Sequence, residues 1–313
     1  MFTFICNQYW ILAVFLIFIG CSSNTSEPLP PVDDYVNSDL LIDTSELNDL
    51  IQSDENLLLI DTRADFESYS LAHIPGAVYF HARRELDDTT NTIEHFMVNG
   101  EVFQEKMQAY GVNVDSRLVI YDEGNSLGSA RLFYALEYYG FQGDVSILNG
   151  GFAAWSADSL VTTSLENQGV TVTSEIGNFV SVIQEDKQCD LAYVTGVEPG
   201  SNKIILDVRS KDEFDGVDVR SAQGGHIPGA IHLEWSEVLV SGDVPTFLPH
   251  DQIQAKFDSL GVTRDKEIIP HCHTNVRGAH SYFTLRLMGY DSVRPFEGSW
   301  SEYGNADGVT IAK

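Results

Sequence analysis

The chain has 313 residues, 43% of them hydrophobic and 20% charged, so it is long enough for two domains with cores of their own. Its 18 Lys and Arg stand against 46 Asp and Glu, a net charge of −28, which argues against a nucleic-acid-binding protein and against electrostatic docking on anionic lipid. Four cysteines are too few for a disulfide scaffold in a chain of this length.

The N-terminus has the pattern of an exported precursor, with a signal peptide over residues 1–21. Residues 9–20 carry no charge, are too few for a comfortable membrane span and lead directly into Cys21. The sequence Phe-Ile-Gly-Cys that ends there resembles a bacterial lipobox, although Leu is usual in its first position and no Lys or Arg precedes it. An ordinary signal peptide and an uncleaved anchor are the alternatives. We expect a protein of the bacterial cell envelope, held to a membrane only through a lipid on Cys21, with a polar tether over residues 22–36.

The remaining chain is a duplication. Asp61-Thr62-Arg63 returns as Asp207-Val208-Arg209, and the run His-Ile-Pro-Gly-Ala at 73–77 returns at 226–230, so the copies are about 150 residues apart. We interpret these repeated motifs as residues that hold the fold. The least patterned stretch lies between the copies. We therefore expect an N-terminal domain over residues 37–160, a linker over 161–187 and a C-terminal domain over 188–313.

Each copy alternates short apolar runs with helical patterns. The first copy predicts strands over 57–60, 118–121 and 145–148 and a helix over 130–139. The second predicts strands over 204–206, 268–271 and 292–296 and a helix over 277–288. This alternation indicates an α/β fold with parallel sheets that are covered on both faces. Ligands of such sheets bind beyond the carboxyl ends of the strands.

The most informative strand end leads into Cys272. The sequence His-Cys-His-Thr-Asn-Val-Arg-Gly at 271–278 places a tight loop between a strand and a helix. Several backbone N–H groups and a helix N-terminus are expected to converge there, which favours a stabilised, nucleophilic thiolate. A buried cysteine that packs as a small hydrophobe is the alternative.

Taken together, the motifs resemble the two-domain form of the rhodanese (thiosulfate sulfurtransferase) family. They are Asp-x-Arg, His-Ile-Pro-Gly-Ala, the strand-end Cys loop with an Arg five residues on, and Glu297-Gly298-Ser299-Trp300, and they span about Asp43 to Asn305. The resemblance implies a small parallel sheet of about five strands, flanked by helices, in each domain. It also implies cofactor-independent sulfur transfer: the Cys272 thiolate takes the outer sulfur of thiosulfate or a similar small anionic donor, and a thiol or cyanide then removes it.

The resemblance assigns roles within the loop. Cys272 is the nucleophile, and the persulfide is held by the residues that follow it, His273, Thr274, Asn275, Val276 and Arg277. Arg277 either pairs with a donor oxyanion or braces the loop. Asn275 is a departure, because relatives usually have Gly there; Asn tolerates left-handed backbone angles, so the loop is still expected to form. Glu213 stands where some relatives place a substrate-binding Arg, and an acid there is expected to repel thiosulfate.

The first copy lacks the nucleophile, because Asp122 occupies the position of Cys272. A carboxylate cannot hold a persulfide, so we expect an inactive N-terminal domain, with Asp122 and Glu123 as solvated loop acids.

Three other functions are open. A phosphatase needs one residue more than the four between Cys272 and Arg277, and a metal site is disfavoured because the adjacent His271 and Cys272 point in opposite directions. A non-catalytic thiol sensor or binding module is the third.

Overall fold

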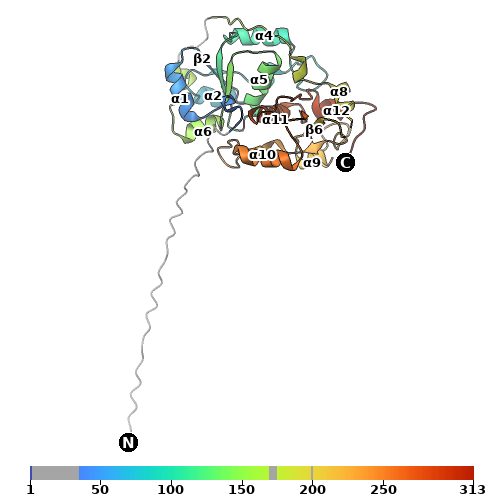
Figure 1. The fold of residues 1–313 in the computed structure, drawn as a ribbon. Coiled ribbons are helices and arrows are strands. Elements are labelled where there is room, and N and C mark those ends of the chain that lie inside the picture. Colours follow the sequence, from blue (N-terminus) through green and yellow to red (C-terminus); the bar gives the residue numbers. More distant parts are fainter. Residues whose placement is uncertain (2–34, 169–174, 199) are drawn as a thin grey trace.

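The computed structural model describes Met1 and residues 35–168, 175–198 and 200–313, which form two α/β halves lying side by side (Figure 1). Apart from Met1, the predicted signal peptide falls outside the described residues, as do Cys21 and most of the predicted tether. The tether's penultimate residue, Tyr35, is buried, and its hydroxyl donates to the Leu248 carbonyl at 2.6 Å. Among the described residues, no helix has both the length and the apolar character needed to cross a membrane.

The N-terminal half is built on five parallel strands in the order β1-β5-β4-β2-β3. These strands are β1 (Leu41–Ile42), β2 (Leu57–Asp61), β3 (Val78–Tyr79), β4 (Arg117–Tyr121) and β5 (Asp144–Leu148). The helices are α1 (Thr44–Ser53), α2 (Phe66–Leu71), α3 (Ala82–Leu86), α4 (Gly100–Ala109), α5 (Leu127–Tyr138) and α6 (Gly151–Ala157), with the short 3-10 helix η2 (Ser38–Leu40) before β1. The predicted parallel sheet, its three predicted strands and its predicted helix are confirmed.

The C-terminal half has a shorter regular sheet, of three parallel strands in the order β7-β6-β8. Its strands are β6 (Lys203–Asp207), β7 (Ile231–His232) and β8 (Glu267–His271). Its helices are α8 (Leu191–Thr195), α9 (Lys211–Phe214), α10 (His250–Ser259), α11 (Val276–Leu287) and α12 (Ser299–Tyr303), with the 3-10 helix η4 (Trp235–Val238).

The predicted strand over 292–296 forms only isolated bridges. It runs beside β8, with Ile268 N–H donating to Ser292 O and Phe296 N–H donating to Pro270 O. The Arg294 N–H donates to the Ile268 carbonyl, but Pro270 has no N–H to donate to the Arg294 carbonyl, so the ladder is interrupted there. The C-terminal domain therefore has three regular strands where about five were expected, and isolated bridges continue its sheet beyond β8.

The parts of the predicted linker that the structure describes pack against the N-terminal half. They contain α7 (Leu165–Gln168) and the 3-10 helix η3 (Glu185–Lys187). Between them, Phe179 is 1% exposed, and its N–H donates to the Val112 carbonyl at 3.0 Å. The connection between the copies is thus partly packed against the first of them.

The repeated Asp-x-Arg motif has the structural role that the sequence predicts. In the second copy, Arg209 Nη2 lies 2.6 Å from Asp207 Oδ2, both side chains are buried, and the guanidinium lies 4.2 Å from the centre of the Trp300 ring. In the first copy, Arg63 Nη2 lies 2.7 Å from Asp61 Oδ2, again with both side chains buried. The motif therefore fixes the end of one strand in each copy.

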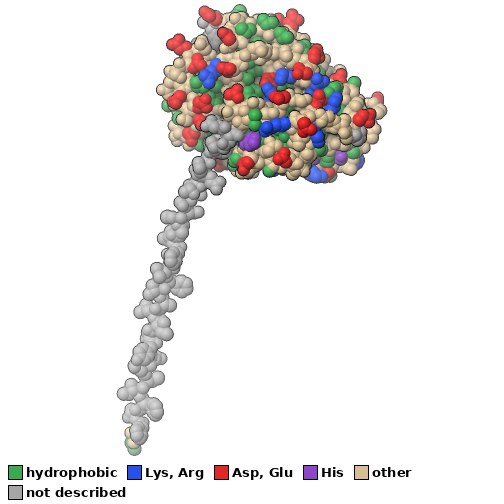
Figure 2. All heavy atoms as spheres, viewed as in Figure 1, with side chains coloured by type: hydrophobic (Ala, Val, Ile, Leu, Met, Phe, Trp, Pro, Cys, Tyr) green, Lys and Arg blue, Asp and Glu red, His purple; other side chains and the backbone are tan. Residues whose placement is uncertain are grey.

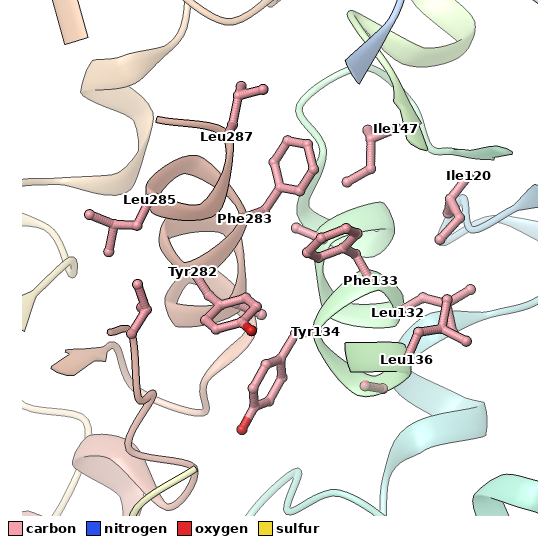
Figure 3. Close-up of a cluster of buried hydrophobic side chains, with 14 of the residues drawn as sticks. Ile120, Leu132, Phe133, Tyr134, Leu136, Ile147, Tyr282, Phe283, Leu285 and Leu287 are labelled. Atoms are coloured by element: carbon pink, nitrogen blue, oxygen red, sulfur yellow. The ribbon is translucent and has the colours of Figure 1, made fainter. Parts of the chain in front are cut away.

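The two halves meet along α5 and α11. Figure 3 shows Phe133 and Tyr134 of α5 facing Tyr282 and Phe283 of α11. The rings of Phe133 and Phe283 are 5.0 Å apart and those of Tyr134 and Tyr282 are 5.1 Å apart, in edge-to-face arrangements worth about 0.5–1.5 kcal/mol each beyond their buried area. Because the strand-end loop of each copy leads into one of these two helices, this contact brings both loops to one cleft.

Candidate active site

Cys272 directly follows β8 and is 1% exposed. Its backbone is held by the Glu297-Gly298-Ser299-Trp300 motif. The Cys272 N–H donates to Ser299 Oγ at 3.3 Å, and the Trp300 N–H donates to the Cys272 carbonyl at 3.0 Å. The next carbonyl, of His273, accepts from the Ser301 N–H at 2.8 Å. The Glu297-Gly298-Ser299-Trp300 motif, which is distant from the loop in sequence, thus holds the backbone of the loop in place.

The loop turns into α11 at Asn275, which has φ 56° and ψ 14°. The loop forms with Asn at this position, as expected from the tolerance of Asn for left-handed angles, and Ser126 has the same conformation at the start of α5, with φ 61°. Within the described residues, the backbone N–H groups of residues 273–277 donate to no protein acceptor. The loop therefore presents a set of N–H groups, backed by the N-terminus of a 12-residue helix, to an anion at the Cys272 side chain.

The first copy shows what such a turn binds. The Asp122 carboxylate accepts from the N–H groups of Gly124 at 2.9 Å, Ser126 at 3.0 Å, Gly128 at 3.0 Å and Ser129 at 3.4 Å. Asp122 is 1% exposed, so the expectation of a solvated acid is wrong for it, because the turn encloses the side chain. Burial and, second, neighbouring Glu123 raise the pKa of Asp122 to about 6, against the opposing effect of the N–H groups.

Glu123, by contrast, is exposed as expected, and it accepts from the Ala64 N–H at 2.7 Å.

Arg277 is held by Glu213. Its Nη1 lies 2.6 Å from Glu213 Oε2 and its Nη2 lies 2.9 Å from Oε1, while Arg220 Nη1 lies 3.1 Å from the same Oε1. Burial opposes ionisation, but the hydrogen bonds from Arg277 hold the pKa of Glu213 at about 2. Burial likewise opposes charge on Arg277, and Glu213 and the Cys272 sulfur together raise its pKa.

Arg277 was expected either to pair with a donor oxyanion or to brace the loop. Because its guanidinium binds Glu213, these contacts favour bracing. The repulsion expected from Glu213 is offset, because this acid is 3% exposed and two arginines bind it.

A cleft of about 460 Å³ lies between the halves and borders the loop. It is lined from the N-terminal half by Thr62, Ala64, His81, Ala82, Arg83, Glu94, His95, Glu123, Asn125, Leu127, Gly128 and Arg131, and from the C-terminal half by Arg220, His273, Thr274, Val276 and Arg277. Its lining holds four arginines and two glutamates, whereas acidic residues outnumber basic ones in the whole chain. On the face shown in Figure 2, acidic side chains are spread widely, while most basic ones gather over the C-terminal half.

His273 also lines the cleft, with its Nε2 3.7 Å from Glu94 Oε2. Burial lowers the pKa of His273. The imidazole is therefore neutral near pH 7, and the positive charge of the cleft comes from the arginines.

Most cleft residues outside the loop, above all Arg83, Arg131 and Arg220, were not predicted from the sequence. Arg131 carried a signal, since it is the one charged residue in the apolar run Leu127–Leu136, and a charge within such a run is retained when a buried partner awaits it. Arg83 and Arg220 lie on exposed segments and carried no comparable signal.

Comparison with known proteins gives the family. The Rhodanese-like domain family matches this chain twice, at residues 43–158 and 196–306. The chain belongs to the rhodanese family. This rhodanese is 29% identical to a thiosulfate sulfurtransferase of Corynebacterium glutamicum, over 89% of the chain and 92% of the relative. It is 32% identical to a 3-mercaptopyruvate sulfurtransferase of Escherichia coli, over 76% of the chain and 82% of the relative.

Solved structures agree with that assignment. The crystal structure of SseA from Escherichia coli, described as a rhodanese fold, superposes with a TM-score of 0.71 at 28% identity and covers 84% of this chain and 99% of that one. The fold expected from the resemblance is thereby confirmed.

Proposed function

We propose that this rhodanese is a sulfurtransferase that moves a sulfane sulfur from thiosulfate to a thiol or to cyanide through a persulfide on Cys272. One observation carries the proposal: Cys272 lies at the base of a turn whose N–H groups have no protein acceptor among the described residues, and the matching turn of the first copy binds an anion, the Asp122 carboxylate. We expect a persulfide anion on Cys272 to take the corresponding place in its own turn, which reaches its left-handed residue one position earlier than the turn of Asp122.

The reaction proceeds in two displacements. In the first, the Cys272 thiolate attacks the outer sulfur of thiosulfate, a sulfur–sulfur bond forms, the sulfur–sulfur bond of the donor breaks, and sulfite leaves with the bonding electron pair. In the second, the acceptor thiolate or cyanide attacks the terminal sulfur, and the Cys272 thiolate is regenerated. The N–H groups of residues 273–277 stabilise the negative charge that stays on the loop between the two steps.

The charge of the cleft supports thiosulfate as the donor. Thiosulfate is a small dianion, and the cleft offers it the guanidinium of Arg83 and the N–H groups of the loop within an otherwise acidic protein. The other three arginines of the lining are already paired, Arg131 with Glu297 and both Arg220 and Arg277 with Glu213. Relatives carry the names of both thiosulfate and 3-mercaptopyruvate sulfurtransferases, and 3-mercaptopyruvate, with its single carboxylate, needs less positive charge. We therefore expect the higher kcat/KM with thiosulfate.

The test compares both donors at fixed cyanide and then examines the protein itself by mass spectrometry. Treatment with thiosulfate is expected to leave one sulfur adduct on the peptide that contains Cys272. Cys272→Ser is expected to fold, to lose the adduct and to lose turnover, because a hydroxyl is far less acidic and cannot carry a persulfide. Cys189 is the other free cysteine of the described residues, and it is also buried. An adduct on Cys189, or turnover retained by the Ser variant, refutes the role of Cys272. A higher kcat/KM with 3-mercaptopyruvate refutes the choice of donor.

We also propose that the protein is exported and held to a membrane of the bacterial cell envelope through a lipid on Cys21. This proposal rests on the sequence pattern alone, since an uncharged run over residues 9–20 ends in Gly-Cys-Ser-Ser.

A further inference from the structure

A buried carboxylate connects the two domains directly behind the active loop. Glu297, from the motif that supports Cys272, is 2% exposed and accepts four hydrogen bonds. Three come from the N-terminal half: Arg131 Nη1 at 3.0 Å, Arg131 Nη2 at 2.6 Å and the Met97 N–H at 3.1 Å. The fourth comes from the loop itself, as Asn275 Nδ2 lies 2.6 Å from Glu297 Oε2. One carboxylate thus joins α5 of one domain to the loop of the other.

The Asn275 side chain fits its surroundings in a single orientation. Its Oδ1 lies over Gly278, where an added Cβ would come within 2.1 Å of it, and its Nδ2 points to Glu297. Gly278 therefore provides the room that the amide needs. Because a carboxylate only accepts hydrogen bonds, the end of the amide that faces Glu297 must be the donor.

Backbone conformation does not explain why residue 275 is Asn. Its φ of 56° is one that Gly adopts without cost, and Gly is the residue that the family resemblance leads one to expect here. From the sequence, Asn275 is only a departure from this Gly that the backbone can tolerate. The structure gives the side chain a buried, charged partner, so the amide contributes something that Gly lacks.

We propose that Asn275 is a positioning residue through which the N-terminal domain sets the geometry of the sulfur-binding loop, along the line Arg131, Glu297, Asn275. The inference rests on the proposed sulfur transfer and deepens it. The domain without a nucleophile then has a defined part in the reaction. It holds the N–H groups of residues 273–277 where they meet the persulfide of Cys272.

The expected size of the effect follows from the sensitivity of such geometry. A misplacement of about 1 Å can lower a rate by about 100-fold. Asn275→Gly keeps the left-handed backbone and deletes only the amide, so we expect kcat for sulfur transfer to fall by about 10- to 100-fold. The KM for thiosulfate is expected to change much less, because the arginines of the cleft stay in place.

The experiment uses the full chain and four variants: Asn275→Gly, Arg131→Met, the double variant, and Arg286→Met as a matched control. Arg286 of α11 pairs with Glu137 of α5, with its Nε 3.2 Å from Glu137 Oε2, so the control removes a different ion pair between the two halves without touching the loop. Each variant is assayed for kcat and KM. Each is also assayed for the rate of Cys272 alkylation by iodoacetamide across a pH series, read by mass spectrometry.

Asn275→Gly and Arg131→Met are expected to lower kcat and to change the pH profile of alkylation in the same direction. The double variant is expected to be no worse than the more damaging single one, because both changes interrupt one line of contacts. Arg286→Met is expected to match the wild type in both assays.

Three results overturn the inference: wild-type kcat and alkylation in Asn275→Gly, multiplied effects in the double variant, or an equal loss in Arg286→Met. If Arg131→Met does not fold, Asn275→Gly still decides, because it leaves the Arg131–Glu297 pair intact. Alkylation needs no sulfur donor, so a wild-type protein that fails to transfer sulfur refutes the proposed function, while the alkylation profiles still test the positioning.

Discussion

Replacement of Glu213 by Gln tests the electrostatics of the loop most directly. The Glu213 carboxylate accepts from Arg277, from Arg220 and from the Ser210 N–H and hydroxyl. The Gln amide keeps one accepting oxygen but turns an NH2 group toward a guanidinium. Glu213→Gln therefore breaks the two-pronged pair with Arg277 and releases both arginines toward the cleft.

The cost in stability follows from the pKa of Glu213. A fall from 4.5 to about 2 corresponds to about 3 kcal/mol for a fully enclosed group, and we take roughly half of that, about 1–2 kcal/mol, because solvent screens this pair at the edge of the cleft. Since folding lowers this pKa, the stabilisation is complete above pH 4.5 and is lost as the pH falls through about 2.

The assays are urea unfolding across a pH series and steady-state kinetics. The variant is expected to unfold about 1–2 kcal/mol more easily near pH 7, with a difference that shrinks below pH 4.5. The freed arginines are expected to lower the KM for thiosulfate, while the unbraced loop lowers kcat. A stability difference that does not change with pH, or a KM that rises, contradicts this reasoning.

Three further predictions concern other parts of the chain. Burial lowers the pKa of His280 to about 3, and neither of its ring nitrogens has a partner in the described structure. The folded protein therefore loses stability as the pH falls below 6.5, by up to about 1.4 kcal/mol per pH unit. His280→Phe keeps a ring stacked on Phe247 and is expected to reduce this acid sensitivity in thermal melts at pH 5 and pH 7. Asp122→Asn is expected to leave kcat close to wild type, and a large loss would mean that the N-terminal turn takes part in the chemistry. Cys21→Ala is expected to release the protein from membranes or to leave an uncleaved precursor in cell fractionation, and native protein found in the cytosol with Met1 intact would contradict the lipid anchor.

Local sequence pattern determined most of the fold. Apolar runs predicted β2, β4, β5, β6 and β8 to within a residue or two, because a strand buried on both faces must be apolar along its length. The pattern was less successful at 292–296, where Pro270 of the neighbouring strand removes a hydrogen-bond donor. A strand depends on its partner as well as on its own residues.

The nucleophilic loop was also visible in the sequence, because Cys272 and residues 273–277 are contiguous and a left-handed Asn is a local property. The ion pairs that support this loop were not visible in the sequence. Arg131 and Glu297 are 166 residues apart, and Arg277 and Glu213 are 64 apart, so nothing in the sequence pairs them.

The duplication, most strands and helices, and the turn that carries Cys272 can be predicted from the sequence, since each depends on residues close together in the chain. The environment of the charged and amide side chains depends instead on tertiary packing. It buries Asp122 in its own turn, binds Glu213 to two arginines and gives Asn275 a partner held by the other domain. The physical reason is that a charge or an amide acts according to its burial and its neighbours, and both are set by how the two copies pack together.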